Sequence, residues 1–334
     1  MVRAVFTCGD VNGIGPEICV KAFQNILVKQ NKNQIVFICP KNVFEHYYKQ
    51  TKSNFDFNFV KNTKDYSNSL LNIIPLPDIK IHFGKINPQS GKTAYNSILK
   101  AIDLINDNKA DVLITAPISK EAINKSGIKL SGHTELLAKS ENSNNYLMTF
   151  LSKDIKAALL TIHKSIRSIS TLISPDKIIS SVELLYKTAV EDFEIPNPKI
   201  AILGLNPHAG ENGLIGDEEI KIITPAIRKL KRKYSVDGPF VPDAFWGNKT
   251  YRNYDFILGM YHDQVLIPFK LLHFNSGVNF TAGLKLIRTS PDHGTAFDIA
   301  GKNIADASSL LQSYKYAIDI FRKRKKYFAS ISKN

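Results

Sequence analysis

Short runs rich in β-forming residues alternate along this chain with longer amphipathic segments, and no other feature of the sequence restricts the fold as strongly. Strand–helix–strand repeats are typical of parallel α/β proteins, in which each helix carries the chain back over the sheet. The first repeat begins at once, with a predicted strand at residues 2–7, a glycine-rich turn, and a helix at residues 16–29 that starts with proline. The alternation therefore predicts a largely parallel α/β architecture.

The alternation continues along the rest of the chain. We expect two strands around a Lys153-Asp154 turn within residues 146–163, and further strands at residues 34–39, 111–116, 199–205, 255–260 and within 278–288. Helices are expected after Ser119, near Thr134, and at residues 42–50, 93–108, 176–191, 217–234 and 308–327. Residues 51–90 are polar and irregular, with short strand-like pieces such as residues 80–83. A chain of 334 residues without a repeat or long linker can form two closely packed lobes.

Composition and charge narrow the class of protein. Hydrophobic residues make up 43% of the chain, but no apolar run approaches the roughly 20 residues that cross a bilayer. The sequence starts with a strand rather than a secretion signal, so we expect a cytoplasmic address and no membrane. The formal net charge of +14 would suit a nucleic-acid partner or an anionic substrate. The only dense basic run, residues 322–326, is expected to be a solvated helix end, and no nucleic-acid-binding motif accompanies it, so we expect no nucleic acid.

The three cysteines, Cys8, Cys19 and Cys39, form no C-x-x-C pair. An odd and sparse count of this kind favours a reducing compartment over a disulfide framework. We therefore expect these cysteines to be small apolar residues of the core; a reactive thiol at Cys8, which lies in a loop, is the alternative.

The glycine-rich turn at residues 9–15 is the first candidate for a ligand contact. Its Gly13-Ile14-Gly15 lacks the third glycine of a dinucleotide fingerprint. Elsewhere in the chain, Gly91-Lys92-Thr93 lacks the earlier glycine of a P-loop, so neither common phosphate motif is present. Three glycines followed by Pro16 favour a ligand-facing loop at a helix N-terminus. A purely structural turn is the alternative.

Three of the eight histidines, His163, His208 and His262, each follow an apolar run that we predict as a strand. Side chains at the carboxyl ends of strands in an α/β sheet line the ligand crevice. Three neutral imidazoles meeting there would suit a catalytic divalent metal that keeps positions open for substrate. The histidines are far apart in the sequence, so spacing alone does not establish that they converge. Separate roles in the core or on the surface are the alternative.

Other polar residues are candidates for binding substrate or moving protons. Asp263 and Asp243 could orient a metal ligand or accept a proton, and Asp243 could equally be a turn residue. His133 and Thr134 lie in a donor-rich helix entrance, where Thr134 could be only a cap. Cations among apolar strands are costly unless they meet an anion. A phosphate or carboxylate is therefore expected near three residues predicted to line late apolar strands: Lys270, Asn279 and Arg288.

Six segments together make the chain resemble, nearly from end to end, the 4-hydroxythreonine-4-phosphate dehydrogenases of vitamin B6 biosynthesis. The segments are GIGPE at 13–17, TAPISK at 115–120, GHTE at 132–135, GLNPHAGE at 204–211, MYHDQ at 260–264 and RTSPDHGTA at 288–296. The first loop departs from the family. Many members read P-G-E-P-A before G-I-G-P, whereas this chain has Cys8-Gly9-Asp10-Val11-Asn12, so the family's contacts do not carry over to residues 8–12.

The resemblance implies a fold like that of the isocitrate and isopropylmalate dehydrogenases, with two α/β lobes and a cleft between them. A cofactor-side lobe would comprise residues 1–130 with 280–334, and residues 131–279 would hold the metal ligands and the dimer interface. The family resemblance also implies an obligate homodimer whose active sites are built from both subunits.

The resemblance further implies roles for particular residues. It implies metal ligands at His163, His208 and His262, for one divalent ion of zinc, magnesium or cobalt. It implies NAD or NADP near Gly13, Gly15 and a late loop, and a small phosphorylated substrate. The late-loop residues are His293, Gly294, Thr295 and Asp298. The implied substrate contacts are His133, Thr134, Lys270, Asn279 and Arg288.

The reaction implied by the resemblance is oxidation of the secondary alcohol of 4-phosphooxy-L-threonine, with hydride passing to the nicotinamide. The resulting β-keto acid would lose carbon dioxide to give 3-amino-2-oxopropyl phosphate, on the route to pyridoxine 5'-phosphate. The sequence leaves three candidates for the proton acceptor: Asp243, Asp263 and Lys120. Three other functions are alternatives: a sister dehydrogenase for phosphorylated threonate or erythronate, a metal-dependent phosphohydrolase, and a non-catalytic phosphate-binding module.

Overall fold

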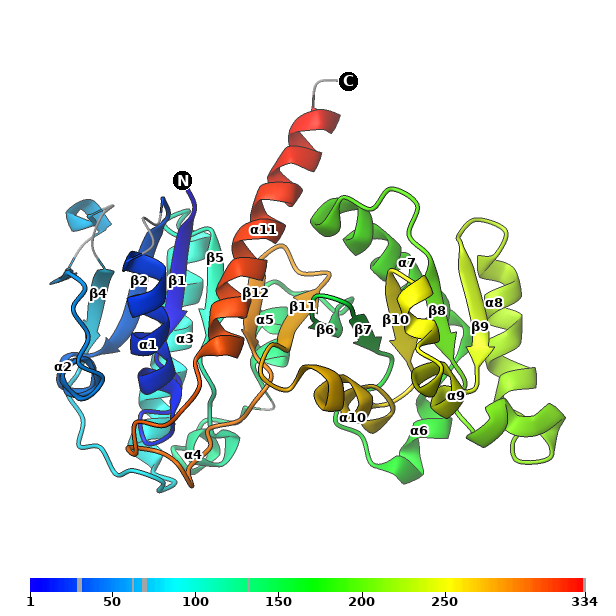
Figure 1. Ribbon diagram of the computed structural model, residues 1–334, viewed down its shortest axis with the longest axis horizontal. Helices are drawn as coiled ribbons and strands as arrows, with labels where there is room; N and C mark the ends of the chain where they lie inside the picture. Colours follow the sequence, from blue (N-terminus) through cyan, green and yellow to red (C-terminus); the bar gives the residue numbers. More distant parts are fainter. Residues whose placement is uncertain (29–31, 62, 68–70, 131, 333–334) are drawn as a thin grey trace. The chain divides into compact units, whose positions relative to one another are not determined.

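A computed structural model describes residues 1–28, 32–61, 63–67, 71–130 and 132–332. The chain forms two compact units, each made of two stretches of sequence (Figure 1). Unit 1 comprises Met1–Asn142 and Lys285–Phe321, and unit 2 comprises Ser143–Leu284 and Arg322–Asn334. The lobes expected from the resemblance, 1–130 with 280–334 and 131–279, and their assignment to cofactor, metal and dimer contacts stay a prediction.

Unit 1 contains a parallel sheet, as the strand–helix alternation predicted. Its strands, in spatial order, are β3 (Phe57–Phe59), β4 (Leu71–Leu76), β2 (Gln34–Pro40), β1 (Arg3–Thr7), β5 (Val112–Thr115) and β12 (Ile287–Pro291). Each strand pairs with its neighbour in parallel. β1 and β2 lie in the middle of the sheet and their side chains are almost entirely buried, which explains why they consist largely of apolar residues.

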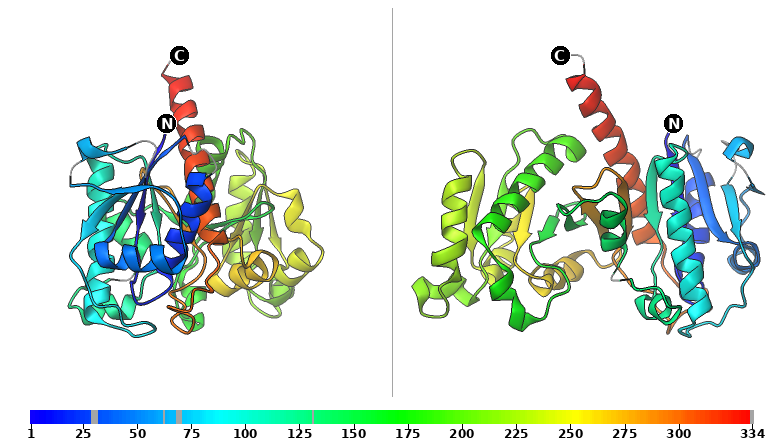
Figure 2. Two further views of the ribbon diagram at one scale, coloured as in Figure 1. Left: turned by 60° about the vertical axis from the view of Figure 1, so that its left-hand side comes forward. Right: turned by 180° about the vertical axis from the view of Figure 1, so that it is seen from behind.

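Helices cover both faces of this sheet, with α1 and α3 on opposite sides (Figures 1 and 2). Helix α3 begins at Pro88, earlier than predicted, because the Asn87 side chain caps it by accepting from the Gln89 N–H and Pro88 suits the first turn. The predicted strand-like piece at residues 80–83 is not a strand. The helices of unit 1 are α1 (Gly15–Val28), α2 (Lys41–Gln50), α3 (Pro88–Asn106), α4 (Lys120–Lys125), α5 (His133–Ser140), the start of α11 (Ser308–Ile331) and a 3-10 turn, η1 (Thr63–Asp65). Lys29, the predicted last residue of the first helix, lies outside the described residues.

Unit 2 contains a mixed arrangement of strands. In spatial order they are β11 (Val278–Ala282), β6 (Leu147–Leu151), β7 (Lys156–Leu159), β10 (Phe256–Gly259), β8 (Ile200–Leu203) and β9 (Val236–Phe240). Strand β6 pairs antiparallel with β11 and β7, which confirms the predicted pair of strands around Lys153-Asp154. Strands β7, β10, β8 and β9 pair in parallel.

Several elements of unit 2 differ from the sequence prediction. The predicted helix at residues 217–234 is a π-helical turn followed by a short α-helix. Strand β9 was missed because its sequence, VDGPF, contains glycine and proline. Helix α10 was also missed, because it contains an internal proline. The helical elements are α6 (Ile166–Leu172), α7 (Pro175–Phe193), η2 (Pro207–Gly213), η3 (Glu219–Ile223), α8 (Thr224–Leu230), α9 (Pro242–Gly247), η4 (Thr250–Asn253), α10 (His262–His273) and the last turns of α11.

The basic run at residues 322–326 is not only a solvated helix end. The Arg324 guanidinium donates to both carboxylate oxygens of Asp192, over 2.6 and 2.8 Å, and to the Leu284 carbonyl over 3.0 Å. The Asp192 side chain is only 3% exposed. Arg324 therefore neutralises a buried carboxylate on α7, which the charge pattern alone could not reveal.

The three cysteines are fully buried and unpaired, which confirms their prediction as apolar core residues. Burial raises the pKa of the Cys19 and Cys39 thiols well above the usual range, so both stay protonated. Within the described part of the chain, no helix is long and apolar enough to cross a membrane.

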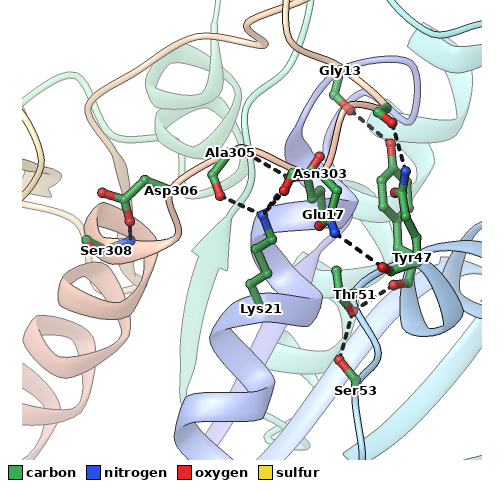
Figure 3. Close-up of polar contacts among 12 residues, drawn as sticks. Gly13, Glu17, Lys21, Tyr47, Thr51, Ser53, Asn303, Ala305, Asp306 and Ser308 are labelled. Carbon is green, nitrogen blue, oxygen red and sulfur yellow. Dashed lines mark hydrogen bonds and ion pairs between the residues drawn. The ribbon is translucent and has the colours of Figure 1, made fainter.

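A buried ion pair ties helix α1 to the segment before α11 (Figure 3). The Glu17 carboxylate is fully buried and accepts from the Lys21 ammonium over 2.8 Å and from the Ala305 N–H over 2.9 Å. Lys21 also donates to the carbonyls of Asn303 and Ala305, over 3.1 and 2.9 Å. The pair thus satisfies backbone groups of a segment far away in the sequence.

Replacing Lys21 should destabilise the protein strongly, because the buried Glu17 carboxyl would lose its cation partner. We expect Lys21→Met to lower the free energy of unfolding by about 3–5 kcal/mol, measured by urea denaturation. Lys125→Met is the matched control, because Lys125 and Glu121 form a helical i,i+4 pair whose side chains are 55% and 57% exposed. The control should change stability by less than about 0.5 kcal/mol. Equal losses in both variants would contradict the assignment.

Candidate functional site

The three predicted metal ligands follow three neighbouring parallel strands of unit 2. His163 comes after β7, His208 after β8, and His262 is the first residue of α10 after β10. Strand β10 lies between the other two, with Leu258 level with Ala158 and Ile202. Because parallel strands end at the same edge of a sheet, the three histidines belong to one edge. Their predicted placement at strand ends is confirmed.

A ring contact joins two of the three histidines, His163 and His262. The ring centroids of His163 and His262 are 6.2 Å apart. The Asp263 carboxylate lies 2.7 Å from Nδ1 of His262. Within the described ranges, no three histidine, cysteine or acidic side chains lie close enough together to hold a metal. Imidazole nitrogens are nevertheless common ligands of divalent ions, so the donor chemistry fits such an ion, while the assembly of all three histidines around it stays a prediction.

The backbone at two of these histidines adopts the left-handed conformation that L-residues usually avoid. His163 has φ of 49° and His208 has φ of 52°. His208 begins a run of such residues that continues to Asn212, whose φ is 54°. Each non-glycine residue in this region costs of order 1–3 kcal/mol, and such strain persists only where the surroundings fix it, often at functional sites. Sequence patterns gave no sign of this run.

A second cluster lies in unit 1, around the buried Arg288 of β12. The Arg288 side chain donates through Nε and Nη2 to the Thr115 hydroxyl at the end of β5, over 3.0 and 2.8 Å. Burial lowers the pKa of Arg288 to about 9, while the nearby Glu135 carboxylate acts in the opposite direction. Arg288 therefore remains charged at neutral pH, with its guanidinium oriented by a neutral hydroxyl.

His133 and Lys120 belong to the same cluster. Burial, and then the charges of Arg288 and Lys120, lower the pKa of His133 well below its usual range, so its imidazole is neutral. Its Nε2 atom is buried and has no hydrogen-bond partner in the described part of the chain. A Cβ on Gly132 would lie 2.6 Å from Glu135 Oε2 and 3.5 Å from Lys120 Cε, which places Lys120 beside this helix entrance. Thr134 next to His133 is also buried.

The cluster of Arg288, Lys120 and His133 can bind an anion. An oriented guanidinium, an ammonium and an imidazole with an unused nitrogen suit a phosphate or carboxylate group. The structure thus brings together three of the predicted site residues. Thr115 and Glu135, which orient and balance Arg288, were missed as site residues, although both lie in the segments that carry the family resemblance.

The remaining predicted residues are placed as follows. Lys270 lies in the last turn of helix α10, so its prediction as a residue lining a strand is wrong; the apolar neighbours that suggested a strand are spread around a helix. Asn279 lies on β11, level with Phe150 of β6. Asp243 is exposed in the first turn of α9, and the Asp263 side chain is 61% exposed.

The two predicted cofactor segments lie side by side in unit 1. The Ile14 N–H donates to the Thr295 carbonyl over 3.0 Å, and a Cβ on Gly13 would lie 2.6 Å from that oxygen. A Cβ on Gly15 would lie 2.4 Å from the Cys8 carbonyl. Close backbone packing therefore explains both glycines, which is the structural alternative stated above. Gly294 and Asp298 are exposed, and contact of this loop with a cofactor stays a prediction.

The differing first loop makes contacts inside unit 1. The Asn12 side chain donates to the Lys85 carbonyl over 2.9 Å and accepts from the His82 N–H over 2.8 Å. Burial raises the pKa of the Asp10 carboxyl, whose Oδ1 accepts from the Asn12 N–H. Asp10 and Asn12 thus hold this loop against residues 82–85 and against each other.

Known proteins resemble the chain over almost its whole length. Residues 30–317 match the model of the family "Pyridoxal phosphate biosynthetic protein PdxA". A 4-hydroxythreonine-4-phosphate dehydrogenase of Sulfurihydrogenibium sp. is 42% identical over 97% of this chain and 100% of its own length. The crystal structure of the Klebsiella pneumoniae 4-hydroxythreonine-4-phosphate dehydrogenase has a TM-score of 0.82 and 33% identity, covering 96% of this chain and 100% of that chain.

More distant structures support the expected fold. An isocitrate dehydrogenase from Methylococcus capsulatus has a TM-score of 0.51 at 12% identity, covering 98% of this chain and 88% of that chain. At such low identity the similarity concerns the fold alone, and it confirms the predicted likeness to isocitrate dehydrogenases. The match of the family model and the identity to curated relatives are more specific. On these grounds the chain belongs to the PdxA family of pyridoxal phosphate biosynthetic proteins.

Proposed function

We propose that this protein is a 4-hydroxythreonine-4-phosphate dehydrogenase, which oxidises 4-phosphooxy-L-threonine with NAD or NADP and a divalent metal. Within the family, the observation that carries the proposal is the cluster of the buried Arg288, the exposed Lys120 and His133, whose charge and unused imidazole nitrogen suit a phosphate ester. The names of the relatives favour a dehydrogenase over a phosphohydrolase or a phosphate-binding module.

The chain's residues would divide the work between binding and chemistry. Arg288, Lys120, His133 and Thr134 hold the phosphate, with the Arg288 fork pre-oriented by Thr115. Lys270 and Asn279 are further candidate contacts for the substrate. A phosphate held in one position also fixes the position of the carbon that loses hydride, so the binding of the phosphate orients the substrate for the reaction.

His163, His208 and His262 would hold one zinc, magnesium or cobalt ion. A bound divalent metal supplies Lewis-acid stabilisation of negative charge as the alcohol is oxidised and carbon dioxide is lost. The bond of Asp263 to Nδ1 of His262 supports an orienting role for this carboxylate, because such a partner leaves Nε2 as the metal-binding nitrogen. Asp243 and Lys120 remain the other candidates for the proton acceptor.

The nicotinamide cofactor would bind beside the glycine-rich turn and the late loop. The hydrogen bond from Ile14 to Thr295 joins these segments, and an added Cβ on Gly294 would meet nothing within 4 Å. The open backbone at Gly294 supports contact with a ligand. The proposed contacts are Gly13, Gly15, His293, Gly294, Thr295 and Asp298.

The proposed function is tested by mixing the purified protein with 4-phosphooxy-L-threonine, NAD or NADP, and a divalent metal. Growth of NADH or NADPH absorbance that a chelator abolishes supports the proposal. Release of inorganic phosphate without reduced cofactor would favour a phosphohydrolase. Preferred turnover of phosphorylated threonate would favour the sister dehydrogenase, and binding without turnover would favour a binding module.

We also propose that the protein is a homodimer in which each active site contains residues of both subunits. Ile267 and Leu271 on α10, and Phe274 directly after it, form one exposed apolar stripe, with 58%, 82% and 71% of their surfaces accessible. Leu214, directly after the segment with His208, is 84% exposed. Exposed apolar side chains gathered next to predicted metal ligands support an interface there.

The homodimer should dissociate when a charge enters the α10 stripe. We expect Leu271→Glu to shift the mass measured by sedimentation equilibrium from dimer towards monomer, because a buried glutamate would lack a partner. Val28→Glu is the control, because Val28 is also exposed, at 63%, but lies on α1. A monomeric wild-type protein at micromolar concentration would contradict the proposal.

Replacing Arg288 should weaken substrate binding more than it slows turnover. Lysine keeps the charge but cannot make the forked contact, so we expect Arg288→Lys to raise KM for the phosphorylated substrate about 10–100-fold. Steady-state kinetics give KM and kcat separately. Arg3→Lys is the matched control, because the Arg3 guanidinium also makes a forked contact, with Asp111. An unchanged KM in Arg288→Lys would remove Arg288 from the phosphate site.

The neutral state of His133 should make the protein less stable in acid. Because its pKa is lowered on folding, the unfolded chain binds a proton below about pH 6.5 that the folded chain does not. The stability that His133 contributes is therefore complete above that pH and falls as pH decreases, by at most about 1.4 kcal/mol per pH unit. Urea denaturation at pH 7.5 and 5.5 should show a smaller loss for His133→Asn than for the wild type. The exposed His46 gives a control, His46→Asn, which should behave as the wild type. Identical losses in all three proteins would contradict this account.

A further inference from the structure

The segment MYHDQ ends in Gln264, for which the proposed function has no role. Gln264 is 7% exposed in the first turn of α10, and its amide makes two hydrogen bonds. Oε1 accepts from the Met260 N–H over 2.7 Å, and Nε2 donates to the Gly204 carbonyl over 2.6 Å. Met260 directly follows β10 and Gly204 directly follows β8. The amide therefore joins these two strands beyond their last ladder pair, Leu258 with Ile202.

A second bridge joins β7 to β10. The Thr161 hydroxyl donates to the Met260 carbonyl over 2.7 Å, and the Leu160 N–H donates to the Gly259 carbonyl over 2.9 Å. Thr161 is only 2% exposed, so this bond is shielded from water. Both polar groups of the Met260 backbone are thus held by side chains, one from each side.

A third contact fixes the loop after β8. The Glu219 carboxylate, in the π-helical turn η3, accepts from the N–H groups of Leu205 and Asn206 over 2.7 and 2.8 Å. It also accepts from the Asn206 side chain over 2.9 Å. A Cβ on Gly210 would lie 2.7 Å from its Oε2 atom, so the left-handed run packs against this carboxylate. Glu219 is 3% exposed.

The three residues at the strand ends that make these contacts all lie at the same distance in sequence from a predicted metal ligand. Thr161, Asn206 and Met260 each stand two residues before a predicted metal ligand, namely His163, His208 and His262. Two residues leave little backbone freedom, so the position of each histidine follows that of the bridged residue. We propose that Gln264 is a positioning residue that, with Thr161 and Glu219, sets the spacing of the three strand ends and so the geometry in which the histidines receive a metal. This inference rests on the proposed function.

An amide suits the position of Gln264 because it offers an acceptor to one strand end and a donor to the other. A carboxylate would lack the donor, and an apolar side chain would leave a buried N–H and a buried carbonyl without their partner. Loss of such an outer contact typically weakens metal binding 10–100-fold.

The test compares Gln264→Met, which keeps the side chain's length but neither hydrogen bond, with the wild type. The first measurement is Co²⁺ affinity of the metal-free protein, read from absorbance of the bound ion. We expect a 10–100-fold weaker affinity. The second is hydrogen exchange of the Met260 amide without metal, which should lose its protection. Unchanged affinity together with retained protection would overturn the inference.

Asn72→Leu is the matched control. Asn72 is a fully buried amide on β4 that donates to the Ile35 carbonyl of β2 over 3.1 Å and accepts from the Ser67 N–H. It also bridges two parallel strands, but in unit 1. We expect this variant to lower the melting temperature and leave Co²⁺ affinity unchanged, which separates positioning from general loss of stability. Equal weakening of affinity in both variants would overturn the inference.

Thr161 provides a second route if Gln264→Met does not fold. Thr161→Val removes the hydroxyl and should weaken Co²⁺ binding, whereas Thr161→Ser keeps it and should restore the affinity. Equal affinity in both variants would overturn the inference. A wild-type protein that binds no Co²⁺, yet loses Met260 protection on substitution of Gln264, would contradict the proposed metal site while supporting the bridge.

Discussion

Parallel pairing of neighbouring strands is the constraint on which both candidate sites depend. Strands that run in the same direction end at the same edge, and their ladder fixes how far each one reaches. In unit 2 this pairing puts β7, β10 and β8, and the histidines that follow them, at one edge. In unit 1 the pairing of β5 with β12 sets Arg288 level with Leu113 and lets its side chain reach Thr115. The hydrogen bonds between the strands align the strand ends only approximately, and buried side chains such as Gln264 and Glu219 fix the residues that follow the strands more closely.

The fold could be predicted wherever the local pattern was strong. The first strand and helix, the pair around Lys153-Asp154 and the helix now seen at Pro175–Phe193 all show clear periodicity. The pattern failed where function or packing overrides local preference: β9 contains glycine and proline, α10 contains proline, and the left-handed run after Pro207 has no periodicity at all. Such elements owe their conformation to distant partners, as the Glu219 contacts show.

The candidate site was predictable in its parts and not in its assembly. Position after an apolar run was enough to place His163, His208 and His262 at strand ends. It could not show that the His163 and His262 rings are 6.2 Å apart, because that depends on the order β7-β10-β8. Likewise, the apolar neighbours of Arg288 predicted an anion beside it, but they could not show that Thr115 orients the guanidinium. The glycines at 13 and 15 are a different case, since close packing against Thr295 and Cys8 already requires glycine there, and their contact with a cofactor stays a prediction.

The bond between Arg324 and Asp192 has a consequence for how the chain folds as it is made. Asp192 is buried on α7, and its cation lies 132 residues further along the sequence. Unit 1 has the same dependence, because β12 and the start of α11 are synthesised after residues 143–284, the first stretch of unit 2. Domains generally fold in the order of synthesis. Neither unit of this protein can complete its folding in this way, since each needs a segment that is synthesised later. Until that segment emerges, the Asp192 carboxylate lacks the guanidinium that pairs with it in the folded protein.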